Sequence, residues 1–453
     1  MHALATDPQF PHLSAALEPA LMKELLQHTL LPRRGDHKQE FVVESCFIGE
    51  KRYKPGKSCV LSYQLHLHDA STGASHEQVL SARLCKSGKG MQEFHQARLQ
   101  NLSLAPKLQP LAYLPEMEMV VWTFPNDRKL THLSQLLDTQ YLESHLPPKL
   151  AAMGLGEFCE IAMIKTEVLH YLPERSCIIR YTVTARRRPT VEFCTVILYG
   201  KTHRDNSGAE TYSVMRQLTE QMPGCAIPLG YDQELRTVWQ SHIPGEPLRW
   251  ETLHAPHALE AIKGVARCVA EFHQCTVQTL HRFDLRAIDE CLIETIEVAE
   301  HACPALAGRI KSLVSALLSR RKSMQWATTW TTPIHRDLKI SNFLIDGERV
   351  SLIDMDCVCI GDPLIDIASL IASTHLNGIL GRCDRDGIGK VVEVLCSTYA
   401  EATARAISWP HLNWYTAAAL LHEITRRSIR QLDTERLKRI ADYLDLTEMY
   451  ASA

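Results

Sequence analysis

The chain contains two copies of one segment, and this internal repetition restricts its fold more than any other feature. The copies read CFIGEKRYKPGKSCVLSYQLHLHDA at 46–70 and IKTEVLHYLPERSCIIRYTVTA at 164–185. Their alignment matches Tyr53 with Tyr171, Pro55 with Pro173, Ser58-Cys59 with Ser176-Cys177, and Tyr63 with Tyr181. Because internal repeats mark recurring structural units, we expect the same small domain to occur twice.

Each copy consists of strand-like runs rich in Val, Ile, Tyr and Cys, separated by turn residues, with one amphipathic segment between them. A second apolar run ends in lysine, the amphipathic segment carries glutamate, and the last run closes in Val-Trp. The matching residues are Lys86 and Lys201, Glu93 and Glu210, and Val121-Trp122 and Val238-Trp239. This order predicts an antiparallel sheet that carries one helix.

From about residue 256 the pattern changes to apolar residues at helical spacing, as in HALEAIKGVARCVAEFHQC and RIKSLVSALLSRR. Two short β-like runs, FLID at 343–346 and VSLID at 350–354, interrupt the helices and predict a hairpin. We expect three domains: 1–150 for the non-catalytic first copy, 151–245 for the second copy, and 246–453 for a mainly helical unit. The weakest boundary signal lies around 140–160.

The sequence PIHRDLKISN at 333–342 leads directly into this hairpin, which ends at Asp354. Phosphoryl transfer needs a carboxylate that accepts the proton of the attacking hydroxyl, and oxygen ligands that hold magnesium against the phosphates. A tight loop that feeds a hairpin brings Asp337, Asn342 and Asp354 together. Oxygen-only ligands suit a hard cation and argue against zinc.

The spacing HRDxxxxN, followed by two hydrophobic residues and an aspartate, resembles the kinase-like superfamily. The chain continues IDMD and then GDPLIDIA at 361–368, which is similar to the aminoglycoside phosphotransferase and choline kinase family. The Asp-Phe-Gly and Ala-Pro-Glu segments of protein kinases are absent from the sequence. Asp362 before Pro363 fits a helix N-cap, and we expect Asp366 to support the loop rather than react.

The resemblance implies an α+β, bilobal protein-kinase-like fold, with an antiparallel-sheet N-lobe and a mainly helical C-lobe, preceded by a second N-lobe-like domain. It implies that Asp337 is the catalytic base and that Asn342 and Asp354 ligate Mg²⁺. Lys339 resembles the protein-kinase lysine that contacts the γ-phosphate, so it is also a candidate catalytic residue. Asp356 fits either a further metal-side carboxylate or a group behind the ligands.

The same resemblance implies that the second copy binds ATP. Lys201 and Glu210 would then form the ion pair that directs an ammonium at the α- and β-phosphates. The segment VWQSHIPGEPL resembles the family's hinge, where backbone groups near Ser241 and Ile243 would pair with adenine. The loop expected to cover the phosphates, at 172–176, lacks a glycine fingerprint.

The expected reaction is ATP- and Mg-dependent phosphorylation of a hydroxyl on a small molecule: a metabolite, sugar, amino alcohol or antibiotic. Two alternatives stay open, a catalytically silent kinase-fold nucleotide-binding scaffold and a protein kinase. The first copy has no catalytic loop of its own, which leaves it three roles: structural relic, cap over the active site, or homodimer contact. The near balance of charge at about 275–330 disfavours cationic aminoglycosides as acceptors.

Composition excludes several classes of partner. Lys plus Arg at 49 nearly balances Asp plus Glu at 52, so no global field favours nucleic acid or an anionic membrane. No run reaches about 18 apolar residues, and the N-terminus lacks a signal-peptide pattern, so we expect a cytoplasmic location. The 15 cysteines are scattered and mostly within apolar runs, which predicts reduced, buried thiols and no zinc site.

Overall fold

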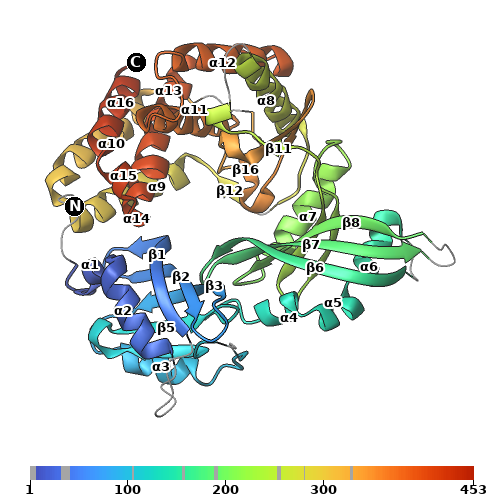
Figure 1. The fold of residues 1–453 in the computed structure, drawn as a ribbon. Helices are drawn as coiled ribbons and strands as arrows, with labels where there is room; N and C mark the ends of the chain where they lie inside the picture. The colour runs from blue at the N-terminus through green and yellow to red at the C-terminus, as the bar shows by residue number, and fades with distance from the viewer. Residues whose placement is uncertain are drawn as a thin grey trace.

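The structure is a computed structural model with three units, two five-stranded sheets and a helical unit that contacts both (Figure 1). It describes residues 7–31, 41–104, 107–155, 159–187, 192–252, 257–279, 281–326 and 330–453. The bilobal arrangement, with an additional sheet domain at the N-terminus, confirms the fold class predicted from the sequence.

The first unit is a sheet with strand order β1-β2-β3-β5-β4, in which all neighbours are antiparallel. Its strands are β1 (Phe41–Lys54), β2 (Ser58–Asp69), β3 (Ser75–Leu84), β4 (Leu111–Leu114) and β5 (Met119–Thr123). Its helices are α1 (Leu13–Ala16), α2 (Pro19–Leu30), α3 (Gly90–Ala97) and the 3₁₀ turn η1 (Pro115–Met117). A sheet carrying one helix between its third and fourth strands is what the sequence of each copy predicts.

The second unit repeats this topology, with strand order β6-β7-β8-β10-β9. Its strands are β6 (Cys159–Leu172), β7 (Ser176–Arg187), β8 (Cys194–His203), β9 (Pro228–Asp232) and β10 (Thr237–Ser241). Its helical segments are α4 (Leu133–Leu137), α5 (Thr139–His145), α6 (Pro147–Leu150), η2 (Ala151–Leu155) and α7 (Gly208–Thr219). The identical strand order confirms that one domain occurs twice.

Hydrogen bonds between equivalent residues extend the repeat to the helices that precede each sheet. The hydroxyl of Tyr63 donates to the carbonyl of Ala16 at 2.8 Å, and the hydroxyl of Tyr181 donates to the carbonyl of Leu136 at 3.0 Å. Both tyrosines are fully buried, so each bond satisfies a hydroxyl that water cannot reach. Each copy therefore includes the short helices on its N-terminal side.

This extension corrects the predicted boundary between the first two domains. The leucines before the second sheet pack into its core, and they are Leu130, Leu133, Leu136, Leu142, Leu146, Leu150 and Leu155. They surround Tyr181 and Trp239, not the first sheet. The second unit thus begins near Leu130, and the boundary expected at 150 lies too late because these helices bury their apolar face on the sheet that follows them.

The helical unit contains the predicted hairpin, β14 (Phe343–Asp346) and β15 (Arg349–Leu352), closed by the pair Asp346 and Arg349. Its other strands are β11 (Glu246–Pro247), β12 (Arg282–Phe283), β13 (Thr332–Ile334) and β16 (Cys359–Gly361). Its main helices are α8 (His257–Gln274), α9 (Leu285–Ala302), α10 (Pro304–Ser323), α11 (Leu364–Ile379), α12 (Ile388–Thr403), α13 (Trp409–Ala419) and α16 (Ile440–Ser452). The remaining segments are η3 (Trp250–Thr252), η4 (Ile340–Asn342), η5 (Met355–Cys357), η6 (Leu420–Thr425), α14 (Arg426–Arg430) and α15 (Thr434–Leu437).

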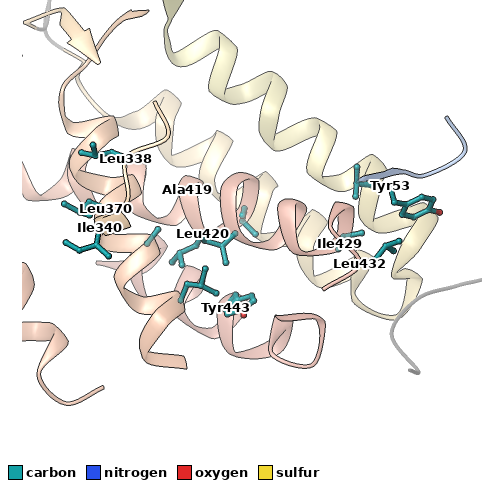
Figure 2. Packing of buried hydrophobic residues seen from close by; sticks show 14 of the residues in the cluster. Tyr53, Leu338, Ile340, Leu370, Ala419, Leu420, Ile429, Leu432 and Tyr443 are labelled. Carbon is teal, nitrogen blue, oxygen red and sulfur yellow. The ribbon is translucent and has the colours of Figure 1, made fainter. Parts of the chain in front are cut away.

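The largest hydrophobic core runs from the first unit into the helical unit without interruption. Figure 2 shows Tyr53 of β1 beside Ile429, in α14, and Leu432, which follows α14. The 14 cysteines whose side chains the structure describes are free and most are buried, which confirms the prediction of buried, unpaired thiols. Among the helices of those same ranges, none combines the length and apolar character needed to cross a bilayer.

Candidate active site

A buried aspartate holds the backbone of the loop between β13 and η4. Arg336 adopts a φ of +63°, in the left-handed region. The carboxylate of Asp366, on α11, accepts the backbone N–H groups of His335 at 2.6 Å and Arg336 at 2.8 Å. Asp366 also lies 3.1 Å from Nε2 of His273. These charge-assisted bonds fix the turn, so Asp366 supports the loop as predicted.

Both carboxylate oxygens of Asp337 contact cations. Oδ1 lies 2.9 Å from Nη2 of Arg427, and Oδ2 lies 3.1 Å from Nζ of Lys339. Burial alone would raise the pKa of this carboxyl, but Arg427 and Lys339 hold the pKa below its usual value. Asp337 is therefore ionised at neutral pH, as a group that orients and deprotonates a hydroxyl must be.

Lys201, at the end of β8, reaches across to the segment that follows the hairpin. Its Nζ lies 2.6 Å from Oδ1 of Asp354 and 2.7 Å from Oδ2 of Asp356. Burial opposes the charge on Lys201 and on Asp354, yet Lys201 lowers the pKa of Asp354 to about 2, and the two carboxylates raise the pKa of Lys201. The second sheet and the helical unit thus share one cluster of charges.

The oxygen atoms of this cluster fit a hard cation. Asp354 and Asp356 converge on one ammonium, so their carboxylates face a common point at which positive charge is stabilised. The amide of Asn342 donates through Nδ2 to the carbonyl of Asp337 at 3.2 Å, which leaves Oδ1 as its acceptor end. Within the residues that the structure describes, no cluster of three or more His, Cys, Asp or Glu has metal-site geometry. Proteins usually bind Mg²⁺ through one or two carboxylates, and phosphate oxygens of the substrate complete the coordination of the ion.

Glu210 does not pair with Lys201, which corrects the predicted ion pair. The carboxylate of Glu210, in the first turn of α7, contacts the hydroxyl of Thr279 and Nε2 of His281. Both partners lie between α8 and β12, so α7 is tied to the helical unit through Glu210. Lys201 instead has Asp354 and Asp356 as its ion-pair partners.

The predicted hinge already uses one of its backbone donors. The N–H of Ser241 donates to the carbonyl of Ile227 at 2.9 Å, and the N–H of Ile227 donates back to Oγ of Ser241 at 2.9 Å. The Ser241 N–H is thus committed to the neighbouring strand, and the pairing of other backbone groups near Ser241 and Ile243 with adenine stays a prediction. Ile243 lines a small pocket beside Asp354, and the pocket's other residues are Met215, Leu218, Cys225, Ala226, Gln240, Leu352, Ile353 and Met355.

Sequence reasoning missed Arg427 and left the place of Asp356 undecided. Arg427 lies 90 residues after Asp337 in a helix without a motif, so nothing in the sequence links the two. Asp356 lies two residues beyond Asp354, and its contact with Lys201 places it in the same charge cluster. Asp362, expected as a cap, accepts the N–H of Leu364 at 2.9 Å at the start of α11.

A comparison with protein-family models matches the part of the chain that contains this site. Residues 199–384 match the model of the phosphotransferase enzyme family (APH), from β8 through α11. This match confirms the resemblance that the motifs indicated. A search of the curated proteins gave no significant match.

Several solved structures resemble the fold at low sequence identity. A choline/ethanolamine kinase family protein from Mesorhizobium loti has 15% identity and a TM-score of 0.46, covering 68% of this chain and 94% of its own. A choline kinase from Cryptosporidium parvum has 12% identity and a TM-score of 0.49, covering 70% and 97%. The aminoglycoside phosphotransferase APH(3'')-Id from Streptomyces rimosus has 15% identity and a TM-score of 0.39, covering 60% and 96%.

Proposed function

We propose that this chain, whose residues 199–384 match the model of the phosphotransferase enzyme family, transfers the γ-phosphoryl group of ATP to a hydroxyl of a small molecule in the presence of Mg²⁺. The contact between Lys201 and Asp354, at 2.6 Å, carries the proposal. It brings together a phosphate-binding cation from one lobe and a metal-binding carboxylate from the other. Phosphoryl transfer depends mainly on such positioning of charges.

Each residue of the cluster then has a distinct task. Asp337 orients the acceptor hydroxyl and takes its proton, while Lys339 stabilises negative charge on the transferred group. Lys201 binds phosphate oxygens of the nucleotide. Asn342 and Asp354 would hold Mg²⁺, which neutralises charge between the β- and γ-phosphates when it is bound.

The charges around Asp337 favour a neutral or anionic acceptor over an amine. An acceptor hydroxyl must approach Asp337, and there it meets the guanidinium of Arg427 and the ammonium of Lys339. A cationic substrate would be repelled at this point.

The test is Mg-dependent turnover of ATP by the purified chain over a panel of neutral, anionic and cationic hydroxyl compounds. We expect turnover with a neutral or anionic compound, and its loss in Asp337→Ala. The matched control is Asp445→Ala, which removes a carboxylate from an exposed ion pair with Arg309. Tight binding of ATP without turnover of any compound would favour the silent scaffold, and phosphorylation of protein alone would favour a protein kinase.

A cytoplasmic location and a dimer through the first copy stay predictions.

A further inference from the structure

The hairpin that joins β6 to β7 is held at its tip by a residue of the first sheet and by residues at the start of the second copy. This tip, residues 172–176, is the loop expected to cover the phosphates, and it lacks the glycines that such a loop often has. Glu174 nevertheless adopts a φ of +56°, a conformation that favours glycine, and its side chain is only 7% exposed. A residue in this conformation persists only where its surroundings enforce it.

One aspartate in each copy binds the equivalent hairpin tip. Oδ2 of Asp127 accepts the hydroxyl of Tyr171 at 2.5 Å and the N–H of Glu174 at 3.0 Å. In the first copy Oδ2 of Asp7 accepts the hydroxyl of Tyr53 at 2.7 Å and the N–H of Gly56 at 2.8 Å. These two hydrogen bonds from one aspartate are therefore part of the repeat. The copies differ at the tip, where the second has Glu174 and the first has Gly56.

That glutamate is bound by two arginines. The carboxylate of Glu174 lies 3.0 Å from Nη1 of Arg83, on β3 of the first sheet, and 3.5 Å from Nη1 of Arg128, in the segment between the two sheets. Nε of Arg128 lies 3.3 Å from Glu93, on α3. Glu93 is the first copy's counterpart of Glu210. Glu210 ties α7 to the helical unit, whereas Glu93 binds Arg128 and so helps to hold the hairpin of the other copy.

We propose that the first copy is a brace that fixes the nucleotide-covering hairpin of the second, with Arg83 as the positioning residue that it supplies, and with Asp127 and Arg128, at the start of the second copy, as further positioning residues. The inference rests on the proposed function, since it concerns the affinity of the same site for nucleotide. A hairpin tip held in one conformation binds phosphate without first having to be ordered, so the brace raises nucleotide affinity. The two arginines also neutralise Glu174, which would otherwise repel the phosphates.

The test compares Mg-ATP binding by calorimetry in the full chain and in Arg83→Gln. Loss of Arg83 leaves a buried carboxylate with a weaker counter-charge, so we expect the Kd to rise about tenfold. Hydrogen exchange of residues 171–177 should become faster in the nucleotide-free variant, which a purely architectural role for Arg83 would not require. The matched control is Asp7→Asn, which breaks the equivalent bonds in the first copy and should leave the Kd for Mg-ATP within twofold.

A double-mutant cycle measures how much of the effect on the Kd comes from the contact between Arg83 and Glu174 itself. In Glu174→Gln the arginines lose their partner, and the further change Arg83→Gln should then add less to the Kd than it does alone. An unchanged Kd and unchanged exchange in a folded Arg83→Gln would overturn the brace while leaving the kinase assignment intact. Failure of the wild-type chain to bind Mg-ATP would overturn both.

Discussion

Nη2 of Arg427, in α14, lies 2.9 Å from Oδ1 of Asp337 in the catalytic loop. The contact joins the C-terminal helices to the residue proposed to deprotonate the acceptor. The first unit packs on the same helices, because Tyr53 and Ile429 share one core. The acceptor side of the site is therefore built from the helical unit and supported by the first copy.

Replacement of Arg427 should change the pH dependence of the reaction. Loss of the guanidinium removes a charge that favours the ionised form of Asp337, so the pKa of Asp337 should rise. The acid limb of kcat/KM should then move to higher pH in Arg427→Gln, and Arg427→Lys should restore part of the shift. Arg426→Gln, which breaks a contact with Glu294, is the neighbouring control and should leave the acid limb in place. An acid limb at the same pH in Arg427→Gln would exclude this role.

Asp366→Asn should destabilise the protein and disturb the catalytic loop. The buried carboxylate accepts two backbone N–H groups and contacts His273, and an amide can accept only through its single oxygen. We expect a loss of about 2 to 4 kcal/mol in unfolding free energy, since a buried hydrogen-bonded charge is replaced by a partly unsatisfied amide. Urea unfolding followed by fluorescence measures this loss. Asp445→Asn on the surface should cost less than about 1 kcal/mol, and equal effects of the two changes would refute the argument.

Glu423 should make stability depend on pH between 5 and 8. Burial raises its pKa from 4.5 to about 7, and the negative charges of Asp337 and Asp366 act in the same direction. The hydroxyl of Ser369, which donates to Glu423 at 2.8 Å, and the charge of Arg427 lower the pKa but do not offset burial. A raised carboxyl pKa stabilises the fold at pH values below 4.5, and this contribution is lost as the pH rises through about 7.

Glu423→Gln should therefore stabilise the chain by about 2 kcal/mol at pH 8 and by little at pH 5. Thermal unfolding of wild type and variant at both pH values measures the difference. The exposed Glu393→Gln, which loses only a surface contact with Lys390, is the matched control. The same difference in Tm at pH 5 and pH 8 would show that burial of Glu423 does not control this dependence.

Local patterns were sufficient to predict the two sheets, the hairpin and the facing of Lys201 toward the segment that follows the hairpin. The strand runs and the tyrosine alignment identify the repeat because each sheet is built from neighbouring segments. Asp337, Asn342 and Asp354 stand out in the sequence because they lie in a short loop and at the end of the hairpin, and their catalytic and metal-binding roles stay predictions. Lys201 could be predicted because its strand ends at the edge of the site, and the structure places it against Asp354.

Contacts between units could not be predicted in the same way. The partner of Glu210 depends on how α7 lies against the helical unit, and Arg427 reaches Asp337 only through tertiary packing. The start of the second copy, by contrast, can be recognised in the sequence. The pattern D-x-x-F-x-H-L-S-x-x-L at 7–17 recurs as D-x-x-L-x-H-L-S-x-x-L at 127–137, and it would have located both Asp127 and the domain boundary.

The most direct test of the charge cluster is calorimetric titration of the chain with ATP, with and without Mg²⁺, in wild type, Lys201→Met and Asp354→Asn. Binding by the wild type should depend on Mg²⁺ and should weaken at least about tenfold in Lys201→Met, because a phosphate loses its buried counter-charge. In Asp354→Asn the affinity for ATP should no longer respond to Mg²⁺. Magnesium-dependent binding of equal strength in all three proteins would contradict the assignment of this cluster as the nucleotide site.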